Sequence, residues 1–360
     1  MAMLVFAGIT AVYAVLQLVH SGPLRAEAFM GCDTYWYERI ALEGYPHVGP
    51  GEDLGHWVGE DIHQTAWAFF PLYPLLLRSM LALTNWSSAE AMIVLSFLLA
   101  LAWIPLAYAL FHHERNERIA KWAVLAMLLQ PFGIYFHLGM SEPLFLVGLL
   151  GSFLAVARGS ALGLALMGTI LVLSRPNGLF LLPGLVLYSL EQEGQGSVRE
   201  ILSHPVHALH KALPLVVPIL AFMCYCAYQW STTGDPLAYL SAQAGWGRRF
   251  THPFSGFFNA GDPATQFDSW YTIILLLLVG LLAKRISLSF CWVMLIVVVM
   301  PLFSGSVASM PRFTTVLFPL FLITGEWLSR IRAPVLVLLI SFIAQLFWFW
   351  AWLEGDLVTC

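Results

Sequence analysis

The sequence predicts an all-α membrane protein that crosses the bilayer many times, and three observations support this fold class. Of its 360 residues, 59% are apolar and only 11% are charged. The mean hydropathy is high, at +0.77. Apolar runs close to the roughly 20 residues that cross a bilayer recur along the chain. Because soluble domains carry about 25% charged residues, a water-soluble globule is excluded.

About eleven of these runs are predicted to be transmembrane helices. They cover residues 3–20, 88–111, 120–136, 143–157, 161–174, 177–190, 212–230, 270–283, 286–303, 313–328 and 333–352. One further run, 66–83, contains Pro71, Pro74 and Arg78. We interpret its part Phe69–Arg78 as a helix along the outer leaflet, with Arg78 reaching the headgroups.

The basic residues orient the spans. If the run 66–83 is not a span, most basic residues fall in loops on one side, which the positive-inside rule makes cytoplasmic. These residues are Arg115, Arg118, Lys121, Arg158, Arg199, Lys211, Lys284, Arg285, Arg330 and Arg332. The opposite face then holds two long loops, 21–87 and 231–269. We predict one transmembrane domain, 1–360, in the plasma (inner) membrane, or in the endoplasmic reticulum membrane of a eukaryote.

The first long loop contains the stretch Gly31–Pro46, GCDTYWYERIALEGYP, directly after the first span. It places the acid Asp33 among Cys32, Tyr35, Trp36 and Tyr37, before a short amphipathic helix that ends at Gly44. On the predicted topology this acid lies just outside the membrane. We interpret Asp33 as a reactive carboxylate on an aromatic floor, where it can meet both lipid and water.

Other polar residues reach the same face from distant parts of the chain. Ser141 can cap the span that follows it, and Glu142 lies where the helix dipole favours a negative charge. Basic residues are supplied by two tight segments and by the second long loop: Arg175, Arg312, Arg248 and Arg249. A single arginine at a membrane boundary is often a headgroup anchor. Together they favour a bound anion, because a guanidinium pairs with phosphate through two hydrogen bonds.

The chain lacks the common nucleotide-binding motifs. It contains neither a GxxxxGK[ST] loop nor a GxGxxG turn after a strand, and the net charge of -4 gives no indication of nucleic acid binding. An activated substrate must therefore arrive through the membrane. An outward acid, several arginines and aromatic surfaces suit an enzyme that takes a group from a phospholipid-like carrier.

Five ordered motifs resemble the PIG-V family, the GPI mannosyltransferase 2 group and its prokaryotic relatives, within the GT-C superfamily of membrane glycosyltransferases. They span about 31–320 and are CDTYWYERIALEGYP, FFPLYPLLLR, YFHLGMSEPLFL, SRPNG and MPRFTTVLFPLF. By resemblance, the loop carboxylate of the family corresponds to Asp33, its outer-leaflet helix to Phe70–Arg78, its acidic helix start to Glu142, and its two motif arginines to Arg175 and Arg312. The chain departs from the family at Cys32, where an aromatic residue is usual.

The resemblance implies a GT-C-like fold and an inverting transfer of a sugar, mannose, from a polyprenyl-phosphate donor to an acceptor hydroxyl of a glycan, glycolipid or protein. Inversion needs a base, here Asp33, and no covalent intermediate. Arg312 and Arg175, with Arg248 and Arg249, are expected to hold the donor phosphate. Expected substrate-binding residues are Trp36, Tyr37, Tyr73, His137, Glu142 and Asn177. A retaining route would need a second acid about 5 Å away, and Glu142 or Asp61 could supply it.

The sequence identifies no cofactor, but it leaves open a bound divalent cation. Its weak candidate ligands in the first long loop are Glu60, Asp61 and His63, whose spacing fits no known ligand pattern. His204, His207 and His210 recur every third residue, which is typical of the polar face of an interfacial helix.

Two other classes of protein compete with the enzyme. A transporter or flippase of lipid-linked saccharides would show an inverted repeat and charges near mid-membrane, whereas here the charges gather at one face and the span count is odd. The third class is a non-catalytic accessory subunit.

Overall fold

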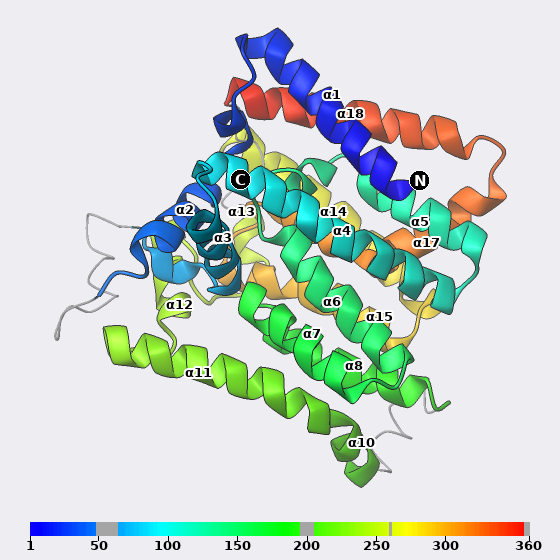
Figure 1. Cartoon of the computed structure of the whole chain (residues 1–360). Coiled ribbons are helices and arrows are strands. Elements are labelled where there is room, and N and C mark those ends of the chain that lie inside the picture. Colours follow the sequence, from blue (N-terminus) through cyan, green and yellow to red (C-terminus); the bar gives the residue numbers. More distant parts are fainter. Residues whose placement is uncertain (48–63, 195–204, 259–260, 356–360) are drawn as a thin grey trace.

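The computed structural model describes residues 1–47, 64–194, 205–258 and 261–355. Within these ranges all regular structure is helical, and the predicted all-α fold class is confirmed (Figure 1). The principal helices are α1 Ala2–Ser21, α4 Ser88–Glu114, α5 Glu117–Leu129, α6 Glu142–Ala157, α7 Ala161–Ser174, α8 Gly178–Glu191, α10 Pro205–Ala212, α11 Val216–Thr233, α14 Pro263–Leu282, α15 Leu288–Val299, α17 Phe318–Arg330 and α18 Pro334–Glu354.

Short helices form the connections at one end of this bundle. The first long loop contains η1 Ala26–Phe29, α2 Thr34–Glu43, η2 Ala66–Ala68 and α3 Leu72–Leu83. The second contains α12 Ala238–Ser241, η5 Ala242–Trp246 and α13 Ser255–Phe258. The four-residue helix α16, Met310–Phe313, precedes α17 at the same end, which we call the site end. The other end of the bundle is called the opposite end.

Two polar contacts join helices at the opposite end. Arg115, at the end of α4, donates to Glu326 of α17 at 2.7 Å. Glu191, the last residue of α8, accepts the backbone N–H of Ser289 near the start of α15 at 3.0 Å. The chain is a multi-pass membrane protein, since five described helical segments are long and apolar enough to span a bilayer: 2–21, 88–114, 205–233, 263–285 and 334–354.

The remaining principal helices are short. Helices α5, α7, α8 and α17 have 13 or 14 residues, a length of about 20 Å against about 30 Å of hydrocarbon. The number of complete spans therefore stays a prediction.

Several predicted helix ends were wrong. The span expected at 120–136 ends at Leu129, because Gln130 precedes Pro131 and takes an extended conformation. The span expected from 313 begins at Phe318, after α16. Helix α14 begins at Pro263 instead of 270, because Asp262 caps it by accepting the Thr265 N–H at 2.9 Å. This capped start shortens the second loop, which was predicted to reach 269.

The run 66–83 contains α3, which has 12 residues. At about 18 Å it is too short to cross the bilayer unaided. It packs against α2 and α4, with Tyr73 and Leu77 buried and Arg78 exposed. These features agree with a segment that does not span the bilayer. The position of α3 in the outer leaflet stays a prediction.

Helix α6 lies at the centre of the bundle, and its residues from Glu142 to Ala155 are buried (Figure 1). It packs closely on α7 at Gly148, where an added Cβ would come within 2.5 Å of the Leu171 backbone nitrogen. Since only glycine allows this approach, the close packing of α6 on α7 fixes their relative position. The start of α6 and the end of α7 thus carry Glu142 and Arg175 into one place.

Candidate active site

Asp33 lies at the start of α2, directly after a tight turn. In this turn Cys32 has a left-handed φ of 53°, and the Thr34 hydroxyl accepts the Gly31 N–H at 2.7 Å. The Asp33 side chain does not cap α2. Its Oδ2 accepts instead from the Arg312 guanidinium, and 22% of the side chain remains exposed. The acid therefore meets both a buried cation and the open side of the site.

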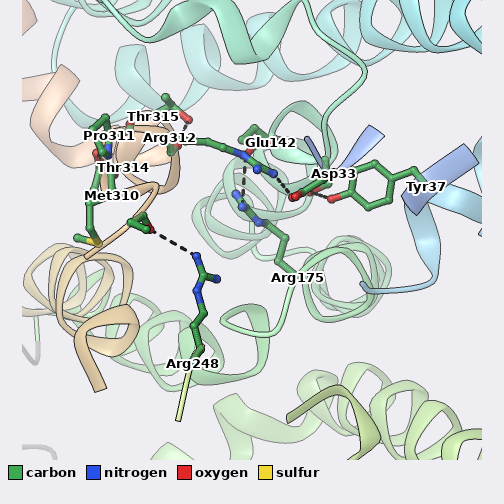
Figure 2. Close-up of polar contacts among 12 residues, drawn as sticks. Asp33, Tyr37, Glu142, Arg175, Arg248, Met310, Pro311, Arg312, Thr314 and Thr315 are labelled. Carbon is green, nitrogen blue, oxygen red and sulfur yellow. Dashed lines mark hydrogen bonds and ion pairs between the residues drawn. The ribbon is translucent and has the colours of Figure 1, made fainter. Parts of the chain in front are cut away.

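Arg312 joins two acids that are distant in sequence. Its side chain is only 1% exposed, and its Nε donates to Glu142 Oε1 at 2.6 Å while NH2 donates to Asp33 (Figure 2). A guanidinium can serve both carboxylates because its donors are fixed in one plane. Arg312 is thus the centre of a buried ionic network.

Glu142 is the most deeply buried member of the network, with a side chain that is 0% exposed. Its Oε1 also lies 3.2 Å from Arg175 NH2, and its Oε2 has no hydrogen-bond partner in the described part of the chain. The capping role expected of Ser141 was wrong. Its hydroxyl accepts from Tyr37 at 2.9 Å and makes no cap bond, because the phenol occupies it.

Arg248 enters the site from the second loop, after η5. Its NH2 donates to the Ala308 carbonyl at 3.4 Å, and no carboxylate among the described residues pairs with it. The pKa of Arg248 is lowered to about 10, mainly by burial; the charge of Asp33 opposes this, and the positive charges of Arg312 and Arg175 add to it. The residue remains a cation at neutral pH with spare donors.

The ring of Phe313 gathers the three arginines. The guanidinium carbons of Arg248, Arg175 and Arg312 lie 5.2, 5.3 and 6.0 Å from its centroid, within reach of cation–π attraction. Three cations and the two carboxylates Asp33 and Glu142 leave one excess positive charge. The arrangement can therefore accept an anionic group without losing its internal pairs.

Helix α14 fixes the segment that carries Arg312. Asp268, buried on α14, accepts the Ser309 N–H at 2.8 Å, and Ser309 has a left-handed φ of 68°. One turn later, Tyr271 bonds the Thr314 hydroxyl at 2.8 Å. Sequence reasoning placed Asp268 in a loop and gave it no role. The signal that could have found it is an acid inside an apolar helix.

Aromatic residues form the wall beside Asp33. The rings of Tyr37 and Tyr73 lie 4.8 Å apart, and the buried Tyr73 hydroxyl has no partner within the described ranges. Burial, followed by the charge of Asp33, raises the pKa of Tyr37 well above its usual value, so it stays a donor. Trp36 packs between Phe69 and Trp246, at 5.8 and 5.7 Å.

Three predicted site residues form no hydrogen bond or ion pair with this network among the described residues. His137 stacks on Phe6 at 4.0 Å and bonds Thr10 at 2.8 Å, as a packing histidine does. Asn177 stands at the start of α8 without a cap bond. The Arg249 side chain is exposed, and its backbone N–H donates to the Ser304 carbonyl at 3.0 Å.

The candidate metal ligands Glu60, Asp61 and His63 lie outside the described residues, as does His204. Within the residues that were described, no three His, Cys, Asp or Glu side chains are grouped as a metal site. His207, on α10, pairs with Glu193 at 2.6 Å, far along the chain from the network. Whether the protein binds a divalent cation therefore stays a prediction.

No family profile matches the sequence, and no curated protein matches it significantly. The structure is similar to the crystal structure of ArnT from Cupriavidus metallidurans bound to undecaprenyl phosphate, with a TM-score of 0.55 and 14% sequence identity. The match covers 95% of this chain and 62% of ArnT, so the chain spans less than two thirds of that protein. The fold is of the GT-C type. The predicted GT-C-like fold is thereby confirmed, while the likeness at this identity shows the fold alone.

Proposed function

We propose that the protein is an inverting glycosyltransferase that moves a sugar from a polyprenyl-phosphate donor to an acceptor hydroxyl on the non-cytoplasmic face. Two findings support this. The fold is that of ArnT, which was crystallised with undecaprenyl phosphate. An acid, a cation that has no acidic partner among the described residues and an aromatic wall lie together at one end of the membrane bundle.

The observation that carries the proposal is the excess cation, Arg248. Two of the three arginines pair with carboxylates, whereas among the described residues Arg248 pairs only with a carbonyl at 3.4 Å. A lipid-linked sugar phosphate is a diester with one negative charge, which this excess balances. When the sugar leaves, the phosphate becomes a monoester whose charge approaches about -2. Arginine donors aimed at that growing charge stabilise the transition state.

The network suggests a division of labour that differs from the expected one. Arg312 was expected to hold the phosphate, yet it is 1% exposed and occupied by Asp33 and Glu142. We assign the first contact with the donor phosphate to Arg248 and Arg175. Arg312 then holds Asp33 in place, and its positive charge stabilises the phosphate without contacting it directly.

The proposed reaction is a single displacement. The acceptor O–H gives its proton to Asp33, the acceptor oxygen bonds the anomeric carbon, and the bond from that carbon to the phosphate oxygen breaks with its electrons on the phosphate. A retaining route needs a second accessible carboxylate. Glu142 does not offer one, since it is 0% exposed and holds two guanidinium groups. Asp61 lies outside the described residues.

The finer assignments rest on the motif resemblance. We propose mannose as the sugar, PIG-V-like membership within the GT-C superfamily, and a glycan, glycolipid or protein as the acceptor. The proposed location is the plasma (inner) membrane, or the endoplasmic reticulum membrane of a eukaryote. Trp36, Tyr37 and Tyr73 are proposed to contact the substrates.

The test is turnover by purified protein in lipid nanodiscs, using undecaprenyl phosphate linked to radiolabelled mannose and, in parallel, to glucose. The proposal predicts release of undecaprenyl phosphate with transfer of the sugar, and repeating the assay with a chelator tests the divalent cation that the sequence leaves open. Asp33→Asn is the matched inactive control. Vesicles that contain the protein separate the competing class, since a flippase would move the intact donor across the bilayer. Donor movement without cleavage of any sugar phosphate would overturn the proposal.

A further inference from the structure

An apolar groove runs from the opposite end of the bundle along α5 and the first half of α18. Its volume is about 630 Å³, and apolar atoms line nearly all of it. Leu125 and Leu129 of α5 form one wall, and Leu338, Leu339 and Phe342 of α18 form the other. The volume falls within the usual range for small-molecule sites, roughly 300–1,000 Å³.

The groove is separate from the candidate active site. It is also lined by Met1, which precedes α1, whereas Asp33 follows the other end of that helix. Helix α1 has 20 residues, a length of about 30 Å. The groove and Asp33 therefore lie near opposite faces of the membrane. On the positive-inside assignment, the face of the groove is cytoplasmic.

Two basic residues lie at the mouth of the groove, on the first turns of α5. Arg118 is exposed and makes no ion pair with any described residue. Lys121 pairs with Glu117 at 2.6 Å, but both side chains are about half exposed, so the pair is open to exchange. The mouth therefore carries one excess positive charge above an apolar slot.

Each of these features alone has an ordinary explanation. Basic residues mark cytoplasmic ends, and apolar side chains face lipid tails. Their coincidence matches the two parts of a single ligand, because a phosphate headgroup needs the cations and a hydrocarbon chain needs the slot. Trp122, which also lines the groove, is of the type that settles at the membrane interface. Negatively charged lipids of the cytoplasmic leaflet are drawn to such basic positions.

We propose that this groove binds an anionic phospholipid of the cytoplasmic leaflet. Its phosphate lies against Arg118 and Lys121, and one acyl chain fills the slot between α5 and α18. The site does not depend on the glycosyltransferase assignment, because its residues are separate from those of the site end.

The test uses the full chain in nanodiscs that contain phosphatidylglycerol or phosphatidylcholine with the same photoreactive acyl chain. After illumination, mass spectrometry locates the labelled peptides. We expect labelling of 117–129 and 334–342 to be at least several-fold stronger with phosphatidylglycerol. The double variant Arg118→Gln with Lys121→Gln should remove this preference. The double variant Arg158→Gln with Lys284→Gln changes two exposed basic residues predicted on the same face; it is the charge-matched control and should retain the preference.

A second variant changes the slot and leaves the charges. Leu339 is half exposed toward the groove, so Leu339→Trp should fold and block the acyl chain, lowering phosphatidylglycerol labelling several-fold. Equal labelling by the two lipids, or labelling unchanged in the double variant, would overturn the proposal. Competition by undecaprenyl phosphate at equimolar amounts would also overturn it, because the site would then belong to the carrier lipid.

Discussion

The two ends of the bundle treat charge in different ways. At the site end, Arg312 and Glu142 are 1% and 0% exposed and bind each other at 2.6 Å. At the opposite end, Lys121 and Glu117 are 49% and 62% exposed, at the same distance. Distance alone therefore does not measure the worth of an ion pair. Breaking a buried pair costs about 3–5 kcal/mol, whereas an exposed pair contributes about 0–1 kcal/mol.

This difference also separates the functions of the two ends. A membrane protein would place basic residues at a cytoplasmic end for orientation alone, with exposed partners or none. Gathering three arginines and two acids around the buried pair of Arg312 and Glu142 has no such topological purpose, and burying that pair costs desolvation. The network therefore supports the catalytic site proposed at the site end, and substitutions there should have much larger effects.

The largest effect is expected for Arg312→Ala. It leaves the buried Glu142 with Arg175 only and leaves Asp33 without its partner, at a cost of about 3–5 kcal/mol. We expect a lower unfolding temperature in detergent and no detectable turnover. Arg312→Lys should recover only part of both, since it restores one charge without the planar fork. An Arg312→Ala protein with parental unfolding temperature would contradict the buried network.

Asp33→Asn should lower the reaction rate without destabilising the fold. It keeps the shape of the side chain but removes the base, so kcat should fall by roughly 10²- to 10⁴-fold with donor affinity nearly unchanged. The matched control is Glu43→Gln, an exposed acid on the same helix that pairs only with Arg39 at 3.1 Å. Near-normal turnover by Asp33→Asn would show that Asp33 is not the base.

Arg248→Ala should weaken donor binding with little loss of stability, because Arg248 has no carboxylate partner among the described residues. A charged hydrogen bond contributes about 1.5–3 kcal/mol, so Kd should rise by about 10- to 100-fold. Arg249→Ala, its exposed neighbour, is the control and should change Kd little. The measurement is donor affinity in nanodiscs, and equal affinities of the two variants would show that the excess cation does not meet the donor.

A smaller effect is expected at Asp268, which holds the segment before Arg312 from α14. Asp268→Ala leaves the Ser309 N–H without its acceptor, at a cost of about 1–3 kcal/mol. We expect turnover to fall by about tenfold, and Asp268→Asn to recover most of it, because an amide oxygen can still accept. Equal losses in the two variants would show that the acceptor at this position is not what matters.

The smallest effect is expected at the opposite end. Lys121→Ala removes an exposed ion pair between residues one helical turn apart, so the unfolding temperature in detergent should stay near the parental value, with a stability change within about 0.5 kcal/mol. A loss comparable with that of Arg312→Ala would break the contrast between the two ends.

Much of the fold was predictable because the membrane leaves few choices. Apolar runs must become helices, since no water satisfies backbone groups in hydrocarbon. The ends of helices were harder to place. Pro131 ended one helix early, and Asp262 started another seven residues before its predicted position. Such boundaries depend on single residues, which the apolar pattern does not resolve.

The candidate site was predictable as a set of residues but not as a network. Asp33, Glu142, Arg175 and Arg312 were named from their motifs, and the structure brings them into contact. Which acid pairs with which arginine was not visible, since Asp33 and Arg312 are 279 positions apart. The contact of Phe313 with the three arginines was not predicted either, because one phenylalanine in an apolar chain does not indicate a cation–π site.

The most direct measurement is a structure of the protein bound to a non-cleavable polyprenyl-phosphate sugar analogue in nanodiscs. We expect phosphate oxygens within about 2.7–3.2 Å of Arg248 and Arg175 nitrogens, with the anomeric carbon facing Asp33 and the pair of Arg312 with Glu142 intact. A phosphate bound elsewhere, with Arg248 still directed at the Ala308 carbonyl and no sugar near Asp33, would contradict the proposed roles of these residues.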